Sequence, residues 1–116
     1  MEKIGPGQLI PVIGSVSDVD VLKAAVQAAT SDASAPLVGL ILNAATAEPF
    51  GRIQDVDAEA WEEALIVNTI SPLKLIQLAL PHLRQNSGRI IFVSTGLAEM
   101  PFSGWSSYCA YEQHVY

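Results

Sequence analysis

The chain has 116 residues, of which 50% are hydrophobic and 16% are charged, so it can form one domain with a modest core and is not a disordered tail. Its net charge is −6, and its six basic residues are scattered, which excludes a basic patch for nucleic acid or for an anionic membrane. A single cysteine excludes an internal disulfide, and we find no signal peptide and no apolar run long enough to span a bilayer. The expected location is therefore the cytoplasm.

The first half of the chain predicts a strand, a helix and a second strand. Residues 9–13 form a short apolar run, and Pro11 within it would confine that strand to the edge of a sheet. Ser17 is the expected N-cap of a helix whose apolar stripe lies within residues 19–29. Residues 37–42 are continuously apolar, as expected of a strand that is buried on both faces.

The second half predicts a long helix and a last strand. The helix should begin near Asp57 or Ala58 and continue to about Arg84, with a kink at Pro72. Residues 89–93 form the last expected strand. Strands that alternate with helices at this spacing indicate a parallel sheet built from βαβ units.

A hydroxyl residue and a tyrosine follow the last expected strand. Thr95 stands thirteen positions before Tyr108, which opens the final expected helix. A tyrosine beside a Ser or Thr hydroxyl can give a proton to a carbonyl group as a hydride arrives. Without further context, the same two residues would be read as a cap residue and a half-buried aromatic. Ser94 offers another hydroxyl, but strand alternation turns it to the opposite face.

Two asparagines occupy positions that allow either a structural or a functional role. Asn43 comes directly after the second expected strand, where it could equally be an ordinary turn residue. Asn68 lies on the apolar stripe of the long helix, and a buried asparagine without hydrogen-bond partners costs about 1–3 kcal/mol. The residues of that stripe are Trp61, Leu65, Asn68, Pro72, Leu75, Ala79 and Leu83.

These motifs together resemble the short-chain dehydrogenases/reductases. The residues from 101 to 110 are similar to those of sepiapterin-reductase-like and fungal members, and residues 42–45 resemble the Asn-Asn-Ala-Gly motif of the family. The resemblance implies that Tyr108 is the general acid, that Thr95 orients the carbonyl group and that Asn68 holds a water on a proton relay. It implies a cofactor, NADP or NAD, with Asn43, Ala44 and Ala45 as the cofactor-binding residues.

The resemblance also implies a fold and an activity. We expect residues 1–116 to form a single partial Rossmann-like domain, a three-layer α/β/α arrangement with a short parallel sheet of about three strands, lacking the first two strands of the family fold. The implied activity is that of an NAD(P)-dependent oxidoreductase that reduces a small-molecule ketone or oxidises an alcohol. Family members dimerise through helices that correspond to residues 58–84 and 105–116, so a homo-oligomer is expected.

Two departures from the family pattern predict that the chain is a truncated and inactive fragment. Glu112 stands four residues after Tyr108, where the family has a lysine, and a carboxylate there disfavours the charged tyrosinate. The glycine-rich turn that holds the cofactor pyrophosphate is absent from this sequence. The alternative is a non-catalytic interaction or dimerisation module derived from the same family. We expect no metal site, because the two histidines, His82 and His114, lack ligand spacing.

Overall fold

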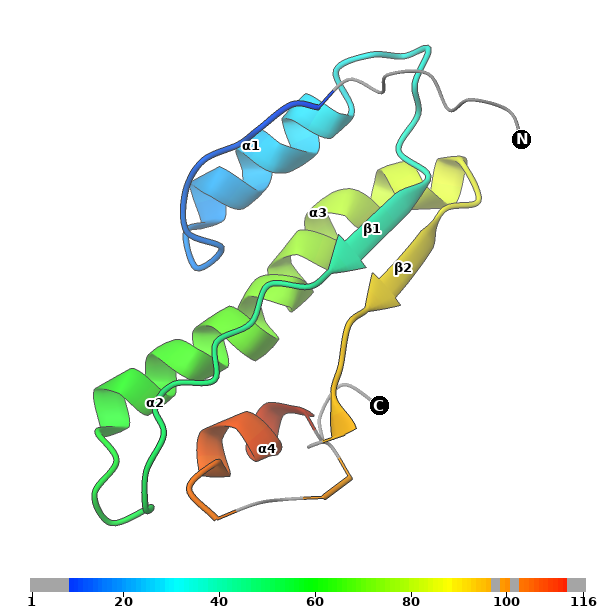
Figure 1. The fold of residues 1–116 in the computed structure, drawn as a ribbon. Coiled ribbons are helices and arrows are strands. Elements are labelled where there is room, and N and C mark those ends of the chain that lie inside the picture. The colour runs from blue at the N-terminus through cyan, green and yellow to red at the C-terminus, as the bar shows by residue number, and fades with distance from the viewer. Residues whose placement is uncertain (1–8, 97–98, 101–102, 113–116) are drawn as a thin grey trace.

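The computed structural model describes residues 9–96, 99–100 and 103–112 (Figure 1). In chain order, the elements are α1 (Val19–Ala29), β1 (Gly39–Leu42), α2 (Ala58–Leu65), the π-helical turn η1 (Ile66–Ile70), α3 (Ser71–Gln85), β2 (Arg89–Phe92) and α4 (Ser106–Glu112). The order of helices and strands confirms the predicted α/β class.

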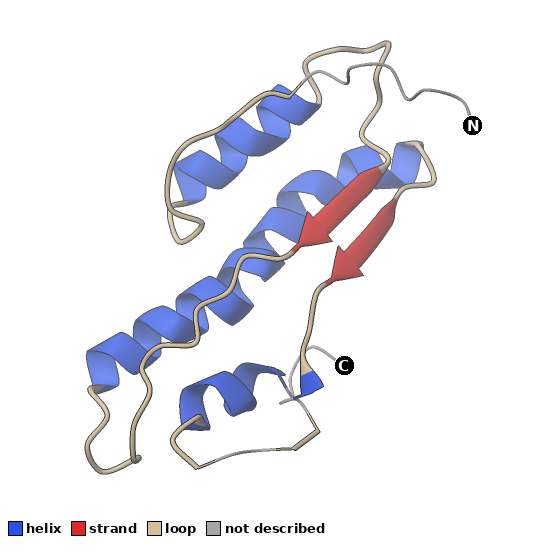
Figure 2. Ribbon diagram, viewed as in Figure 1, coloured by secondary structure: helices blue, strands red, loops and turns tan. Residues whose placement is uncertain are grey.

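The two described strands lie side by side in parallel (Figure 2). Leu42 at the end of β1 lies opposite Phe92 at the end of β2. The pairing continues one step further, because the Val93 N–H donates to the carbonyl oxygen of Leu42 at 3.0 Å. The carboxyl ends of both strands therefore meet at one edge of the sheet, and the loops that follow them start as neighbours.

The prediction of a strand at residues 9–13 is wrong. This segment pairs with neither described strand, and Leu9 and Ile13 are 89% and 90% exposed. In Figure 1 the segment runs along α1 and does not reach the free edge of β1. Pro11 has no N–H to give to a sheet, which weakens any such pairing. The parallel sheet is confirmed, but its described part has two strands and not the expected three.

The expectation that residues 37–42 are buried on both faces is also wrong. Helix α3 packs against β1 and covers the face that holds Leu42, which is 9% exposed. Ile41 points to the opposite face and is 65% exposed. Its partner in the sheet, Ile91, lies on the same face and is 53% exposed. The described residues thus cover the sheet with helix on one side, and the second helical layer of the expected three-layer arrangement is not among them. We call the side that carries Ile41 and Ile91 the open face.

The N-terminus of α1 is capped by Asp18 and not by Ser17. The Asp18 carboxylate accepts a hydrogen bond from the Asp20 N–H at 2.9 Å, which satisfies one of the unpaired amides of the first turn. The Ser17 hydroxyl has a different partner, since it donates to Glu63 Oε1 of α2 at 2.9 Å. Both residue types are good N-caps, so local sequence alone did not separate them.

Helices α2, η1 and α3 form one continuous rod from residue 58 to residue 85, close to the predicted range. Asp57 caps it by accepting from the Glu59 N–H at 3.0 Å. The irregularity expected at Pro72 takes the form of the π turn. There the Ser71 N–H and hydroxyl both donate to the carbonyl oxygen of Ile66, the hydroxyl at 2.8 Å. Single π turns are rare interruptions of α-helices, and this one lies just before Pro72, which lacks the amide that an α-helix requires.

The π turn also changes which residues of the rod face the core. Of the predicted stripe, Asn68, Ala79 and Leu83 are buried, while Trp61, Leu65, Pro72 and Leu75 are half-buried. Ala64 and Ser71 are buried although the stripe did not include them. The extra residue in the turn shifts the helical phase, so a stripe drawn at a constant 3.6-residue period is displaced near the turn.

The length of this rod corrects one expectation from the sequence. By length and composition alone, residues 58–85 suffice to cross a membrane. The apolar runs within the sequence are shorter because polar residues interrupt them. Core helices of soluble proteins pass the same test, and this one packs against α1 and β1.

Candidate active site

The loop that follows β1 carries the three residues expected to meet a cofactor. Asn43, Ala44 and Ala45 are exposed at the carboxyl end of the strand. Asn43 and Ala44 line a pocket of about 160 Å³, whose wall is mostly apolar and includes Leu22 of α1 and Pro72 of α3. Two alanines in succession leave the backbone of this loop accessible to a close approach.

Asn68 holds this loop in place. Its side chain is buried, with 7% exposed, and makes two hydrogen bonds to the backbone of Thr46, the residue after Ala45. Oδ1 accepts from the Thr46 N–H at 2.9 Å, and Nδ2 donates to the Thr46 carbonyl oxygen at 2.9 Å. The amide thus pairs with the loop as a neighbouring strand would, so Asn68 has a structural role. The proton-relay role of Asn68 stays a prediction.

Thr95 lies where the chain leaves β2. The bond between Val93 and Leu42 keeps the two strands together up to this point, so Thr95 follows β2 at the same sheet edge where Asn43 follows β1. Thr95 is exposed, whereas Ser94 is half-buried. Thr95 is therefore the more exposed of the two residues.

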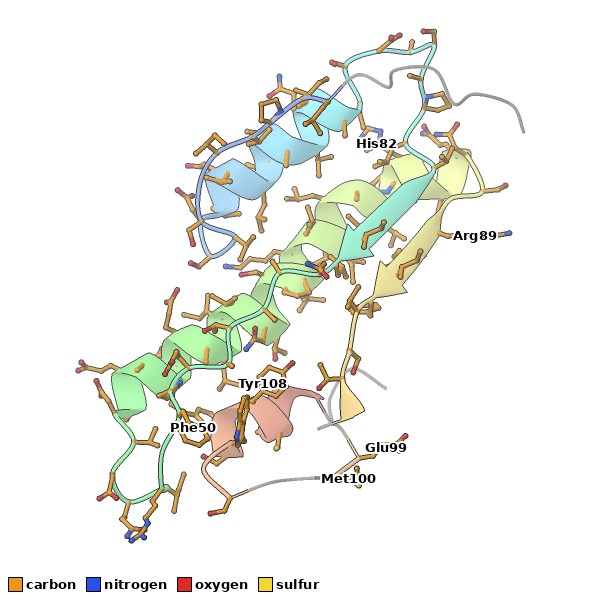
Figure 3. All side chains as sticks on the ribbon, in the orientation of Figure 1. Phe50, His82, Arg89, Glu99, Met100 and Tyr108 are labelled. Carbon is orange, nitrogen blue, oxygen red and sulfur yellow. The ribbon has the colours of Figure 1, made fainter. Side chains whose placement is uncertain are left out.

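Tyr108 comes from α4, which packs against α2. Its side chain is 9% exposed, and Figure 3 shows it on the side of α4 that faces α2. The phenol ring meets the Trp105 ring edge-on, with centroids 5.5 Å apart and planes at 85°. Glu112 closes α4 one helical turn later, but its side chain lies outside the described part of the structure.

The structure brings together some of the predicted site residues. Asn68 is hydrogen-bonded to the loop that contains Asn43. Thr95 follows β2 at the edge of the sheet where Asn43 follows β1. The segment just before α4, the helix that carries Tyr108, touches the same loop further along the chain, because the Gly51 N–H donates to the carbonyl oxygen of Gly104 at 3.0 Å. Cooperation between the phenol of Tyr108 and the hydroxyl of Thr95 stays a prediction.

Sequence reasoning missed Phe50 and Gly104. Phe50 meets Trp105 edge-on at 5.3 Å, and Gly104 has a positive φ of 87°. The only signals in the sequence were an aromatic residue beside a glycine in one loop and a glycine before Trp105 in another. Neither signal says that the two loops touch.

The residues present fit a nicotinamide cofactor only in part. The loop at Asn43 offers one open wall, but its pocket is smaller than the roughly 300–1,000 Å³ of most ligand sites. A pyrophosphate is usually held at a helix N-terminus, and here Asp18 and Asp57 cap α1 and α2. A carboxylate at that position repels a phosphate, so neither of these two N-termini suits a pyrophosphate.

Comparison with known proteins identifies the family. The sequence model for short chain dehydrogenases matches residues 1–111. An uncharacterised oxidoreductase of Schizosaccharomyces pombe is 35% identical over 104 residues, which cover 90% of this chain and 41% of that protein. A benzil reductase of Saccharomyces cerevisiae, which forms (S)-benzoin, is 37% identical over 78 residues, covering 62% of this chain and 30% of the enzyme.

Solved structures agree with this result. The crystal structure of a short-chain dehydrogenase/reductase from Saccharomyces cerevisiae matches with a TM-score of 0.84 and 31% identity, over 90% of this chain and 41% of the other. A cytoplasmic protein of unknown function from the same yeast matches with a TM-score of 0.74 and 31% identity, over 90% of this chain and 41% of that protein. The chain thus spans about 41% of the length of these relatives. The predicted resemblance is confirmed, and the chain belongs to the short-chain dehydrogenase/reductase family of oxidoreductases.

Proposed function

We propose that this chain is the catalytic segment of an oxidoreductase that reduces a small ketone. In this proposal Tyr108 donates a proton to the carbonyl oxygen and the Thr95 hydroxyl orients that oxygen. Asn68 fixes the loop beside them. The observation that carries the proposal is the pair of hydrogen bonds from Asn68 to Thr46, which holds the cofactor-side loop at the sheet edge where Thr95 emerges.

The chemistry of the residues supports these roles. An uncharged phenol is a proton donor, and a positioned donor contributes about 10²–10⁴-fold to a reaction of this kind. A threonine hydroxyl can donate to the same carbonyl oxygen. NADP or NAD would supply the hydride beside Asn43, Ala44 and Ala45. The described residues fit that cofactor only in part, so the roles proposed for them are limited to the carbonyl group of the substrate. A cytoplasmic location fits the proposal, since one structural relative is a cytoplasmic protein.

The proposal includes the inactivity of the chain by itself. Glu112 replaces the lysine that the family places one helical turn after the tyrosine, so the cation that would stabilise a tyrosinate is missing from that position. This sequence also lacks the glycine-rich turn that holds the cofactor pyrophosphate in the family, so hydride delivery is unsupported as well. Glu112→Lys alone is therefore not expected to produce turnover.

Weak cofactor binding is the first expected result. Titration of the chain with NADPH or NADH should not saturate in the micromolar range, because this sequence lacks the glycine-rich turn that holds the pyrophosphate in the family, and the N-termini of α1 and α2 carry the carboxylates of Asp18 and Asp57. The fluorescence of Trp61 and Trp105 reports the titration, and the yeast benzil reductase under the same conditions is the positive control. A micromolar dissociation constant for this chain would contradict the expectation.

A chimera tests the catalytic roles separately from the missing parts. Residues 9–110 of this chain replace the matching segment of the yeast benzil reductase, which keeps its own remaining sequence. We expect the chimera to form benzoin and Tyr108→Phe to lower its kcat about 10²–10⁴-fold. Thr95→Val should also lower kcat, whereas Ser94→Ala, the matched change at the neighbouring hydroxyl, should have little effect. A folded, active chimera that tolerates Tyr108→Phe would refute the proposal.

The alternative function is a non-catalytic interaction or dimerisation module. The observation that favours it is Glu112 in place of lysine, which counts against catalysis. Residues 58–84 and 105–116 would form the contact between two copies, as in the family, although residues 113–116 lie outside the described part. This alternative predicts a defined oligomer and a chimera that folds without turnover.

A further inference from the structure

A line of three aromatic rings joins the loop after β1 to α4. Phe50 of the loop meets Trp105 with ring centroids 5.3 Å apart and planes at 73°, and Trp105 meets Tyr108 at 5.5 Å and 85°. Both contacts are edge-to-face, a geometry that aromatic pairs prefer. Figure 3 labels Phe50 and Tyr108, the two residues that Trp105 contacts.

Gly104 allows this line to form. Its φ of +87° lies in the region that glycine adopts without strain, and a Cβ at this position would lie 3.1 Å from Cε2 and Cζ of Phe50. The carbonyl oxygen of Gly104 accepts from the Gly51 N–H at 3.0 Å. The backbone of the second loop therefore passes directly against the Phe50 ring, with a hydrogen bond beside it.

Core packing does not by itself account for Phe50. Its side chain is 61% exposed, so most of its surface lies outside the core. Its inner edge, however, touches the residue that contacts Tyr108 and the glycine just before α4. Phe50 thus contacts the residues just before α4, the helix that carries the proposed proton donor.

We infer that Phe50 and Gly104 are positioning residues for Tyr108, acting through Trp105. The inference rests on the proposed function, because the position of the phenol matters only if Tyr108 donates a proton. Fixing Trp105 from the side of the loop sets the rotation of the first turn of α4, and with it the direction of the phenol. Displacement of a catalytic group by about 1 Å can cost on the order of 100-fold in rate.

Circular dichroism in the near ultraviolet tests the geometry without any activity. In the background Trp61→Phe, Tyr111→Phe and Tyr116→Phe, the 116-residue chain keeps one tryptophan and one tyrosine, which are the contacting pair. Phe50→Leu should reduce the signal of that pair by roughly half or more, since the ordered edge-to-face contact is lost. Ile53→Ala, in the same loop and also exposed, is the matched control and should leave the signal unchanged. Far-ultraviolet spectra confirm that each variant is folded.

A double-mutant cycle tests whether Gly104 acts through Phe50. Gly104→Ala should reduce the same signal because its Cβ meets the Phe50 ring. In the Phe50→Ala background that collision is gone, so the additional effect of Gly104→Ala should be clearly smaller. Equal effects in both backgrounds would show that Gly104 matters only for its own backbone conformation, which contradicts the inference.

The chimera separates a positioning role from a purely structural one. Phe50→Leu should lower kcat about 10-fold or more with KM nearly unchanged, because a displaced phenol affects the chemical step and not substrate binding. If Phe50 only stabilised the fold, Phe50→Leu would reduce the amount of folded chimera but would leave the kcat of the folded molecules unchanged. An unchanged dichroism signal and kcat in Phe50→Leu would overturn the inference while the proposed function stands. An inactive chimera whose dichroism responds to Phe50→Leu would instead refute the function and keep the geometry.

Discussion

The isolated chain is expected to self-associate, and Ile41→Lys is expected to shift it toward the monomer. The open face leaves Ile41 and Ile91 largely exposed, and within residues 9–96, 99–100 and 103–112 no strand pairs with the edge of β1 that faces away from β2. Parallel sheets are normally covered on both faces, and an uncovered apolar strand edge is a template for pairing with another chain. Covering an exposed isoleucine is worth about 1.5–3 kcal/mol, so contact between two open faces is favourable. Size-exclusion chromatography with light scattering measures the association.

The neighbouring residue supplies the matched control. Leu42→Lys changes the same strand by the same substitution, but Leu42 faces α3 and is 9% exposed. Burial of an unpaired charge is costly, so this variant should unfold and not become a soluble monomer. A monodisperse wild-type monomer with a cooperative melt would show that the open face does not drive association. Equal behaviour of the two lysine variants would contradict the assignment of the two faces.

Loss of the Asn68 amide is expected to cost about 2–3 kcal/mol of unfolding free energy. Asn68→Ala removes the side-chain amide that bonds to both the N–H and the carbonyl oxygen of Thr46, and the loss of a bond to a buried polar group costs about 1–3 kcal/mol. Thr46 is half-buried, so water can replace part of the loss. Urea denaturation in the Ile41→Lys background, where association is reduced, measures the change in midpoint.

Asn86→Ala is the control for this substitution. Asn86 also uses its side-chain amide on a backbone group, donating to the carbonyl oxygen of His82 at 2.8 Å, but it is exposed. Water can satisfy that carbonyl after the substitution, so the expected loss is within about 0.5 kcal/mol. Similar losses for the two variants would show that Asn68 does not hold the loop through its buried bonds.

The two sets of measurements also bear on the two candidate functions. A dimer of defined size that survives dilution and persists in Ile41→Lys favours the interaction module, whose contact would lie on the helices of residues 58–84 and 105–116. Continuous growth into larger species favours a catalytic segment whose sheet lacks its usual cover. The scaffold itself matches that of full-length relatives over 90% of this chain, although the chain spans only 41% of their length.

Sequence alone determined the elements that depend on local chemistry. The long helix begins at the Asp57 cap, and the strands lie within the two apolar runs that contain Leu40 and Ile90. Capping and hydrophobic periodicity act between residues a few positions apart, so they can be read directly from the chain. The motif around Tyr108 indicated the family for a similar reason, because its spacing is a property of the sequence itself.

Tertiary structure alone decided how these elements are used. Residues 9–13 have the composition of a strand, but whether a strand forms depends on a partner with a free edge, which no local pattern reveals. The phase of the helix around Asn68 depends on a π turn, and its bonds reach Thr46, 22 positions earlier. The contact between Phe50 and Gly104 joins segments more distant still. Such contacts arise only when the chain closes on itself, because their energies depend on distances in space and not along the sequence.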